Sequence, residues 1–240
     1  MKRVIVIPAR YASTRLPGKP LAQIAGKPLI QWVYERASTS TLKDDILIAT
    51  DDVRIRDATL SFGASVAMTS PDCASGTDRV YEAIKGRDAD IIINLQGDEP
   101  LIRGDMIDGL FSVLEGESLD MATLCVPLSD KNELETPHTV KVVLDRNGFA
   151  LYFSRSPIPF FQKPSEMAIY KHVGIYGFSR SFLERFVSLP KGQLEETESL
   201  EQLRALEAGY KIKVLIVDYD GISVDTPEDL ERARLRLSQT

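Results

Sequence analysis

Residues 4–20 have the sequence Val-Ile-Val-Ile-Pro-Ala-Arg-Tyr-Ala-Ser-Thr-Arg-Leu-Pro-Gly-Lys-Pro, in which an apolar run leads directly into a polar loop. The apolar run, residues 4–7, is typical of a buried β-strand. The loop that follows carries Arg10, Arg15 and Lys19, together with hydroxyl groups and a glycine. Guanidinium and ammonium groups are the usual partners of phosphate oxygens, and exposed backbone N–H groups supplement them. The stretch therefore predicts a strand that ends in an anion-binding loop.

The charge of this stretch contrasts with that of the whole chain. Residues 1–34 contain six Lys or Arg residues and no Asp or Glu, whereas the 240-residue chain has a formal net charge of −6. A concentrated cationic loop on an acidic protein indicates a local anion site, because the overall charge would repel an anion. A basic surface loop without a ligand is the alternative. The acidic balance argues against non-specific binding of nucleic acid.

Composition limits the protein class. Hydrophobic residues make up 43% of the chain and charged residues 27%, which is ordinary for a soluble globular protein. No apolar stretch approaches the roughly 20 residues that cross a bilayer, and the N-terminus lacks a signal-peptide pattern. We therefore expect a cytoplasmic protein with no membrane partner. The two cysteines, Cys73 and Cys125, lie far apart in the sequence, which is consistent with reduced thiols.

Strand-like and helix-like segments alternate through the first half of the chain. The apolar runs of strand length are residues 4–7, 46–49, 65–68, 91–95 and 121–126, and the amphipathic segments are about 28–40, 52–62, 78–86 and 104–115. This alternation predicts an α/β fold with a mostly parallel sheet flanked by helices. Ligands of such sheets bind outside the carboxyl ends of the strands. The loops at 8–20 and 96–100 both follow strands, so we expect them to form one site.

The second half of the chain has a different order of elements. The expected elements are a strand pair at 140–144 and 149–153 around a turn at 145–148, a loop at 156–169, a strand at 170–178, a helix at 194–208 and a strand at 211–217. Thr226 followed by Pro227 and, at the third helical position, Asp229 predicts the start of a final helix. We expect one domain over 1–240, in which residues from about 130 to 190 form a smaller mixed subdomain or an arm that pairs two subunits.

Two carboxylates are candidates for a magnesium site. Asp98 follows the buried strand at 91–95, and Asp225 stands between a strand and the start of the final helix. Mg²⁺ prefers one or two carboxylates together with phosphate oxygens and water. A carboxylate beside a cationic phosphate loop is well placed for this role. The alternatives are a plain turn residue at Asp98 and, at Asp225, a residue that favours the helix dipole.

The remaining candidates are less specific. The segment Ser75-Gly76-Thr77-Asp78-Arg79 could meet a base or a phosphate, or could simply cap a helix. His172 stands alone on a predicted strand, and Arg155 with the acids at 195–198 suggests a second pocket or a charged surface. The chain contains no Cys/His cluster, no GxSxG, and neither GxGxxG nor GxxxxGK[ST]. Zinc, acyl-transfer, ordinary dinucleotide and P-loop sites are therefore not predicted.

Several stretches together resemble the 3-deoxy-manno-octulosonate cytidylyltransferase (CMP-Kdo synthetase) family. The similar stretches are 7–20, Ser-Gly-Thr-Asp-Arg at 75–79, Gln-Gly-Asp-Glu-Pro at 96–100, 140–145, 150–155, His-Val-Gly-Ile-Tyr-Gly-Phe at 172–178, Leu-Glu-Gln-Leu-Arg at 200–204 and 224–231. The first stretch is shared by the wider sugar-nucleotide transferase group. The stretches at 172–178 and 200–204 are more specific. The segment at 156–169 is shorter than in some members of the family.

The resemblance implies a nucleotide-diphospho-sugar transferase (Rossmann-like) fold and a Mg²⁺-dependent homodimer. The implied reaction is CTP + Kdo → CMP-Kdo + pyrophosphate, for lipopolysaccharide biosynthesis. The implied roles are catalysis for Lys19, Arg15, Asp98 and Asp225, nucleotide binding for Ala9, Arg10, Ser13, Arg15, Lys19, Ser75, Arg79 and Gln96, sugar binding for Gln96, Arg155, His172, Tyr176, Glu195 and Glu198, and metal binding for Asp98 and Asp225.

Three alternatives to this reaction stay open. The acceptor could be another acidic sugar, such as the 8-amino analogue of Kdo, because no motif excludes it. A glycosyltransferase of similar topology commonly has an Asp-x-Asp metal motif, which residues 96–100 lack. A non-catalytic nucleotide-binding protein would have lost catalytic groups, yet Lys19, Asp98 and Asp225 are all present.

Overall fold

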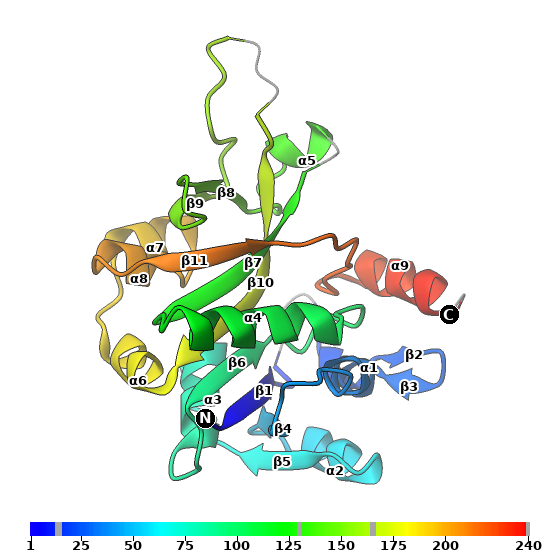
Figure 1. Cartoon of the computed structure of the whole chain (residues 1–240). Helices are drawn as coiled ribbons and strands as arrows, with labels where there is room; N and C mark the ends of the chain where they lie inside the picture. Colours follow the sequence, from blue (N-terminus) through cyan, green and yellow to red (C-terminus); the bar gives the residue numbers. More distant parts are fainter. Residues whose placement is uncertain (13–15, 129–130, 164–166, 239–240) are drawn as a thin grey trace. The chain divides into compact units, whose positions relative to one another are not determined.

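The computed structural model describes residues 1–12, 16–128, 131–163 and 167–238 (Figure 1). Ser13 and Arg15, two of the predicted site residues, lie outside the described residues. The chain forms two compact units, one made of Met1–Phe111 with Asp220–Thr240 and the other of Ser112–Tyr219. The helices in the described part of the chain are not long and apolar enough to cross a membrane.

The first unit is built on a parallel sheet of four strands. They are β1 (Arg3–Ala9), β4 (Asp45–Thr50), β5 (Ser65–Met68) and β6 (Ile91–Leu95), in the order β6-β1-β4-β5 (Figure 1). Ile5 in β1 pairs with Ile46 on one side and Ile93 on the other, and all three side chains are buried. Continuous apolar runs of this kind are expected of strands that are covered on both faces. The predicted parallel arrangement is confirmed for this unit.

Helices alternate with these strands as predicted. The helical elements of the first unit are the 3₁₀ helix η1 (Lys19–Leu21), α1 (Leu29–Ala37), α2 (Val53–Ser61), α3 (Gly76–Ile84), α4 (Gly104–Gly116, which continues into the second unit) and α9 (Pro227–Leu237), and a short ribbon pairs β2 (Gln23–Ile24) with β3 (Lys27–Pro28). Thr226 caps α9 by accepting from the backbone N–H of Asp229, whose carboxylate accepts from the Thr226 N–H in return. This reciprocal pair confirms the predicted start of the last helix.

Gly104, at the start of α4, stands against another backbone segment. A Cβ atom added there would lie 2.4 Å from both the Ser40 N and the Thr39 carbonyl carbon, whereas one added at Gly116, in the same helix, would meet nothing within 4 Å. We therefore expect Gly104→Ala to lower the free energy of unfolding by about 1–3 kcal/mol, because the backbones must move apart. Gly116→Ala is the control and should change it by less than about 1 kcal/mol. Urea denaturation of both variants measures this, and equal effects would contradict the close approach.

The second unit contains a mixed sheet. Its strands are β7 (Met121–Pro127), β8 (Lys141–Leu144), β9 (Ala150–Ser154), β10 (Tyr170–Ser179) and β11 (Ile212–Ile216), and its other helices are α5 (Lys131–Glu135), α6 (Arg180–Ser188), α7 (Gln193–Glu198) and α8 (Leu203–Glu207). β7 runs parallel to β11 and antiparallel to β10, and β8 pairs antiparallel with β9 and β10. The predicted strand pair around 145–148 is confirmed, and the Asp145 side chain accepts from the backbone N–H groups of Asn147 and Phe149.

The predicted single helix over 194–208 is wrong, because two short helices, α7 and α8, occupy this segment. α7 ends at Glu198, and its C-cap residue Ser199 has a φ of 51°, in the left-handed region. The break lets Glu195 of α7 and Arg204 of α8 form two hydrogen bonds, of 2.6 and 2.7 Å. In one continuous helix these residues would be about 13.5 Å apart along the axis. A tertiary ion pair therefore accompanies a break that the helical periodicity did not indicate.

Candidate functional site

A cavity of about 340 Å³ lies at the carboxyl ends of β1 and β6 in the first unit. Its lining consists of Pro8, Ala9, Arg10, Ala12, Lys19, Pro20, Cys73, Ser75, Gly76, Arg79, Gln96, Gly97, Asp98 and Asp225. β1 ends at Ala9 and β6 at Leu95, and the two strands are adjacent and parallel. The parallel pairing brings the loops that follow these strands to the same edge of the sheet. The predicted meeting of the two loops is thus observed.

The Lys19 side chain connects the two predicted metal ligands. Its Nζ donates to Asp98 Oδ2 at 2.7 Å and to Asp225 Oδ1 at 3.1 Å. Burial disfavours the charge on Lys19, but the two carboxylates outweigh this effect and raise the pKa of the ammonium group above its usual value. The ammonium therefore stays protonated at neutral pH.

Local backbone structure places these three side chains. Gly18, which precedes Lys19, has a φ of 69°, in the left-handed region that favours glycine, and its N–H donates to the Tyr11 carbonyl. The Val224 N–H donates to the Asp98 carbonyl at 2.9 Å, which ties the segment before α9 to the loop after β6. Asp225 is thereby brought next to a residue 127 positions earlier in the chain.

The positions of Asp98 and Asp225 fit a divalent metal ion. Both carboxylates reach one ammonium group, so both can reach one metal ion of similar position. Among the residues that the structure describes, no group of three or more His, Cys, Asp or Glu side chains is placed to hold a metal. Two carboxylates that leave the remaining positions to phosphate oxygens and water are the set that Mg²⁺ prefers.

Arg79 forms another wall of the cavity and is fixed by polar partners. Its side chain is buried, with Nη1 donating to Thr69 Oγ1 at 2.5 Å and Nη2 to Asp51 Oδ2 at 3.2 Å. These hydrogen bonds hold the Arg79 guanidinium in one position at the cavity wall. Ser75, another lining residue, caps α3 by accepting from the Asp78 N–H.

A series of side-chain hydrogen bonds holds Gln96 in the cavity wall. Its Nε2 donates to Asn94 Oδ1 at 3.1 Å, and Asn94 in turn donates to Thr77 Oγ1 at 3.1 Å. Asp51, Thr69 and Asn94 were not predicted as site residues. Asn94 could have been predicted from the sequence, because it is the one polar residue in the otherwise apolar run Ile91–Leu95. No sequence pattern linked Asp51 or Thr69 to Arg79, since each lies on a separate segment.

Cys73 also lines the cavity, but its thiol is not activated. Sγ donates to Glu82 Oε2 at 3.0 Å. Burial, together with this hydrogen bond to Glu82, raises the pKa of the Cys73 thiol to about 11. The thiol is therefore protonated at neutral pH and is a poor nucleophile.

The structure gathers most of the predicted nucleotide and metal residues in this cavity. Ala9, Arg10, Lys19, Ser75, Arg79, Gln96, Asp98 and Asp225 all line it. Ser13 and Arg15 lie outside the described residues, so their roles stay predictions.

Two predicted sugar-binding residues lie close together on β10 of the second unit. The rings of His172 and Tyr176 have centroids 5.4 Å apart. His172 Nε2 lies 2.9 Å from Thr123 Oγ1, and the Tyr176 hydroxyl donates to Gln202 Oε1 at 3.0 Å. Gln202 is buried, and its Nε2 has no hydrogen-bond partner among the described residues. Gln202 was not predicted, although it lies within the Leu-Glu-Gln-Leu-Arg stretch.

The other predicted sugar-binding residues are engaged with protein groups. The Glu198 carboxylate accepts from the Ser154 hydroxyl at 2.6 Å and from the Arg155 N–H at 3.0 Å. The Arg155 guanidinium donates to the Glu198 carbonyl at 2.8 Å. Glu195 holds Arg204 with both carboxylate oxygens, and both side chains are buried. Sugar contact by Arg155, Glu195 and Glu198 stays a prediction. The hydrogen bonds to protein groups give each of these residues a structural role.

His172 is expected to make the protein less stable in acid. Burial lowers the pKa of its imidazole from 6.5 to about 3. Between these values the unfolded chain binds the proton and the folded chain does not. The contribution of His172 to the free energy of unfolding is therefore complete above pH 6.5. As the pH drops below 6.5, this contribution decreases by at most about 1.4 kcal/mol per pH unit. Urea denaturation from pH 7 to pH 4 should show a shallower decline for His172→Gln. His138→Gln, at the exposed second histidine, is the control, and an unchanged slope for His172→Gln would contradict this assignment.

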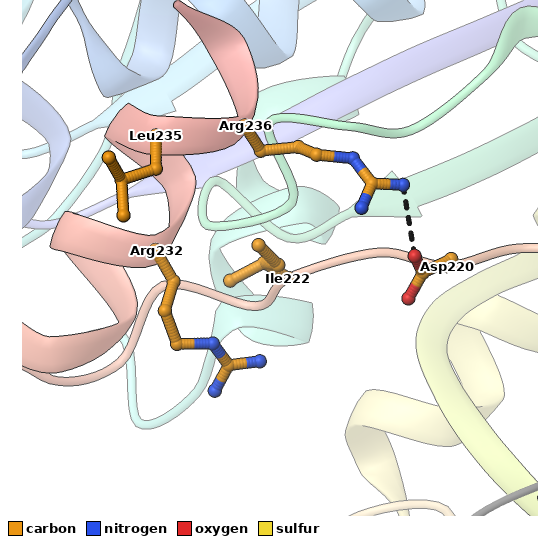
Figure 2. Close-up of a pocket in the computed structure, with 5 residues that line it drawn as sticks. All are labelled: Asp220, Ile222, Arg232, Leu235 and Arg236. Carbon is orange, nitrogen blue, oxygen red and sulfur yellow. Dashed lines mark hydrogen bonds and ion pairs between the residues drawn. The ribbon is translucent and has the colours of Figure 1, made fainter. Parts of the chain in front are cut away.

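A second cavity in the first unit, of about 360 Å³, has a different chemistry. Figure 2 shows its lining, which consists of Asp220, Ile222, Arg232, Leu235 and Arg236. Asp220 is the only acid among these five residues, and it accepts from Arg236 Nη2 at 2.9 Å (Figure 2). Since no pair of carboxylates lines this cavity, the Lys19 cavity is the better candidate for metal-assisted chemistry.

Comparison with known proteins agrees with this geometry. The profile of a family described as cytidylyltransferase matches residues 4–212. The chain is 54% identical to the 8-amino-3,8-dideoxy-manno-octulosonate cytidylyltransferase of Shewanella pealeana and 53% identical to that of Shewanella frigidimarina, in each case over 99% of both chains. It is 47% identical to a CMP:2-keto-3-deoxy-manno-octonic acid synthetase whose structure was solved with CTP, with a TM-score of 0.96 over 100% of this chain and 99% of the other. The chain therefore belongs to the cytidylyltransferase family, whose members are nucleotidyltransferases.

Proposed function

We propose that the protein transfers CMP from CTP to an eight-carbon 3-deoxy sugar acid and releases pyrophosphate, with 8-amino-3,8-dideoxy-manno-octulosonate as the preferred acceptor. The observation that carries the proposal is the cavity in which Lys19, Asp98 and Asp225 meet beside Arg10. The choice of acceptor is supported by the names of relatives that are 53–54% identical over nearly the whole chain.

Kdo itself, the acceptor that the sequence resemblance implies, is the second candidate. It is supported by the 47% identity to a CMP:2-keto-3-deoxy-manno-octonic acid synthetase. The two sugars differ at one substituent, an amine or a hydroxyl on carbon 8. A site that hydrogen-bonds or charge-pairs with such a group discriminates more strongly than one that only packs against it.

The chemistry is an in-line displacement at phosphorus. The anomeric hydroxyl of the acceptor attacks the α-phosphorus of CTP and loses its proton to solvent. The bond from that phosphorus to the bridging oxygen breaks, and pyrophosphate leaves with the bonding electron pair. Catalysis of such transfers consists mainly of positioning and charge stabilisation. Arg10 and Lys19 would bind the triphosphate, and their charges would offset the charge that develops on pyrophosphate. Ser75, Arg79 and Gln96 supply the polar wall against which the nucleoside would be held.

Asp98 and Asp225 are the residues that would hold Mg²⁺. When bound to these carboxylates and to the triphosphate, Mg²⁺ supplies positive charge that offsets repulsion between the anionic substrates. As the sequence resemblance implies, the proposed enzyme is a homodimer that acts in the cytoplasm. Its product would serve as a sugar donor for lipopolysaccharide biosynthesis.

Pyrophosphate release tests the proposal directly. The purified protein is supplied with CTP, Mg²⁺ and one of three acceptors, which are 8-amino-3,8-dideoxy-manno-octulosonate, Kdo and sialic acid. We expect kcat/KM for the amino sugar to exceed that for Kdo by at least about tenfold and sialic acid to be inactive. A preference for Kdo would reverse the choice of acceptor while keeping the reaction. No release with any acceptor, from folded protein that binds CTP, would refute the proposal and favour a non-catalytic nucleotide-binding protein.

A further inference from the structure

The Lys19 ammonium is bound between the same two carboxylates that are assigned to the metal. Nζ lies 2.7 Å from Asp98 Oδ2 and 3.1 Å from Asp225 Oδ1. The three residues come from separate segments, namely η1, the loop after β6 and the turn before α9. The Lys19 and Asp98 side chains are only 15% and 20% exposed. This contact is therefore a partly buried tertiary feature, not a surface ion pair.

Lysine and metal compete for the same carboxylate oxygens. Mg²⁺ binds oxygen at about 2.1 Å and does not tolerate an ammonium group in the same position. A metal ion that binds both Asp98 Oδ2 and Asp225 Oδ1 would take the place that Nζ occupies. Even beside that place, two cations within one small cavity repel each other. Metal binding through both oxygens therefore requires the Lys19 ammonium to leave them.

Among the described residues that line the cavity, Asp98 and Asp225 are the acidic ones, so a different anionic partner for Lys19 must come from a bound anion. Lys19 lines the cavity together with Arg10 and Arg79, which are themselves cationic. An ammonium group that left the two carboxylates without an anion in the cavity would lose two hydrogen bonds and its charge pairing. A triphosphate in the cavity supplies phosphate oxygens, to which the ammonium can turn without loss of charge pairing.

We propose that Lys19 is an internal counter-cation that keeps divalent metal off Asp98 and Asp225 until a triphosphate draws it away. Metal and nucleotide then bind with positive coupling, because each favours the arrangement that the other needs. This inference rests on the proposed function for the identity of the triphosphate. Its central claim, that Lys19 opposes metal binding in the nucleotide-free protein, concerns only residues of this chain.

Manganese binding to the nucleotide-free protein tests the claim. Mn²⁺ alone is the probe, and free Mn²⁺ is measured by electron paramagnetic resonance during titration of the full-length chain. Lys19→Met removes the ammonium group and is expected to tighten Mn²⁺ binding by at least about tenfold, because the carboxylates lose their competing cation. Lys19→Arg keeps a cation in place and should bind Mn²⁺ as weakly as the unmodified protein. Lys19→Gln serves as a second neutral variant if Lys19→Met does not fold.

Two controls identify the site at which Mn²⁺ affinity increases. Lys27→Met removes a different lysine from an ion pair, that with Glu35 on α1, and should leave Mn²⁺ affinity unchanged. Adding Asp98→Asn to Lys19→Met should abolish the gain. Equal Mn²⁺ affinity of Lys19→Met and the unmodified protein, or a gain that survives Asp98→Asn, would overturn the inference. Because no nucleotide or sugar is present, failure of the transferase assay leaves this result intact, and failure here leaves the transferase proposal intact.

Discussion

Turnover of an Asp98→Asn variant is expected to fall by roughly 10²–10⁴-fold while the protein stays folded. Asparagine has nearly the same shape but removes the negative charge that would hold Mg²⁺ beside the triphosphate. The fold should survive, because Lys19 keeps its ion pair with Asp225 at 3.1 Å. The measurement is kcat and KM for CTP by pyrophosphate release, with a thermal melt as the check of folding.

The control for this result is Asp220→Asn. Asp220 is also an aspartate near α9, but its side chain is 82% exposed and pairs with Arg236 in the second cavity. Its activity should remain within about twofold of the unmodified protein, since exposed ion pairs contribute little. Lys19→Ala should lose activity to a similar degree as Asp98→Asn, and the double variant should be little worse than either, because residues that act as a unit are not additive. Full activity of both single variants would refute the site assignment.

A Glu195→Ala variant is expected to lower the free energy of unfolding by about 3–5 kcal/mol. Glu195 and Arg204 are only 7% and 5% exposed and are joined by two hydrogen bonds of 2.6 and 2.7 Å. Removal of the carboxylate leaves a buried guanidinium with little access to water, and Glu201, at 3.8 Å, replaces the two lost hydrogen bonds only in part. The pair also joins α7 to α8, so we expect the loss to extend to the packing of both helices. Urea denaturation measures the effect.

A double variant distinguishes the buried charge from other causes. Glu195→Leu with Arg204→Met removes both charges of this pair and should be more stable than Glu195→Ala, in which the buried guanidinium keeps the longer contact of 3.8 Å with Glu201 in place of its two hydrogen bonds. Glu35→Ala breaks the exposed pair with Lys27 and should cost less than about 1 kcal/mol. If Glu195→Ala instead kept its stability and raised only KM for the sugar, the predicted sugar contact would be the main role of Glu195.

Local sequence was sufficient to predict much of the first unit. Continuous apolar runs such as Ile91-Ile92-Ile93 indicated buried parallel strands, and Thr226-Pro227 indicated the start of α9. These signals depend on neighbouring residues, through burial on both faces of a strand or through a cap. The rule that ligands bind at the carboxyl ends of parallel strands then placed the loops at 8–20 and 96–100 together.

The break between α7 and α8 was not predictable in this way. Residues 194–208 have helical periodicity, but the backbone turns at Ser199, and Glu195 meets Arg204 across the break. The energy that favours this arrangement comes from a contact between two helices. Intrinsic helix preferences of a few tenths of a kcal/mol per residue are too small to oppose such a contact.

The polar partners of the site also depended on the tertiary structure. Asp51 and Thr69, which lie 28 and 10 residues before Arg79, fix its side chain. Lys19 lies between Asp98 and Asp225, which are 127 residues apart. The residue types alone indicated which side chains could bind phosphate and metal, because charge and donor chemistry belong to each side chain. Which of them share one cation was decided by chain folding, because electrostatic and hydrogen-bond energies depend on distances of a few ångströms between segments that the sequence does not place.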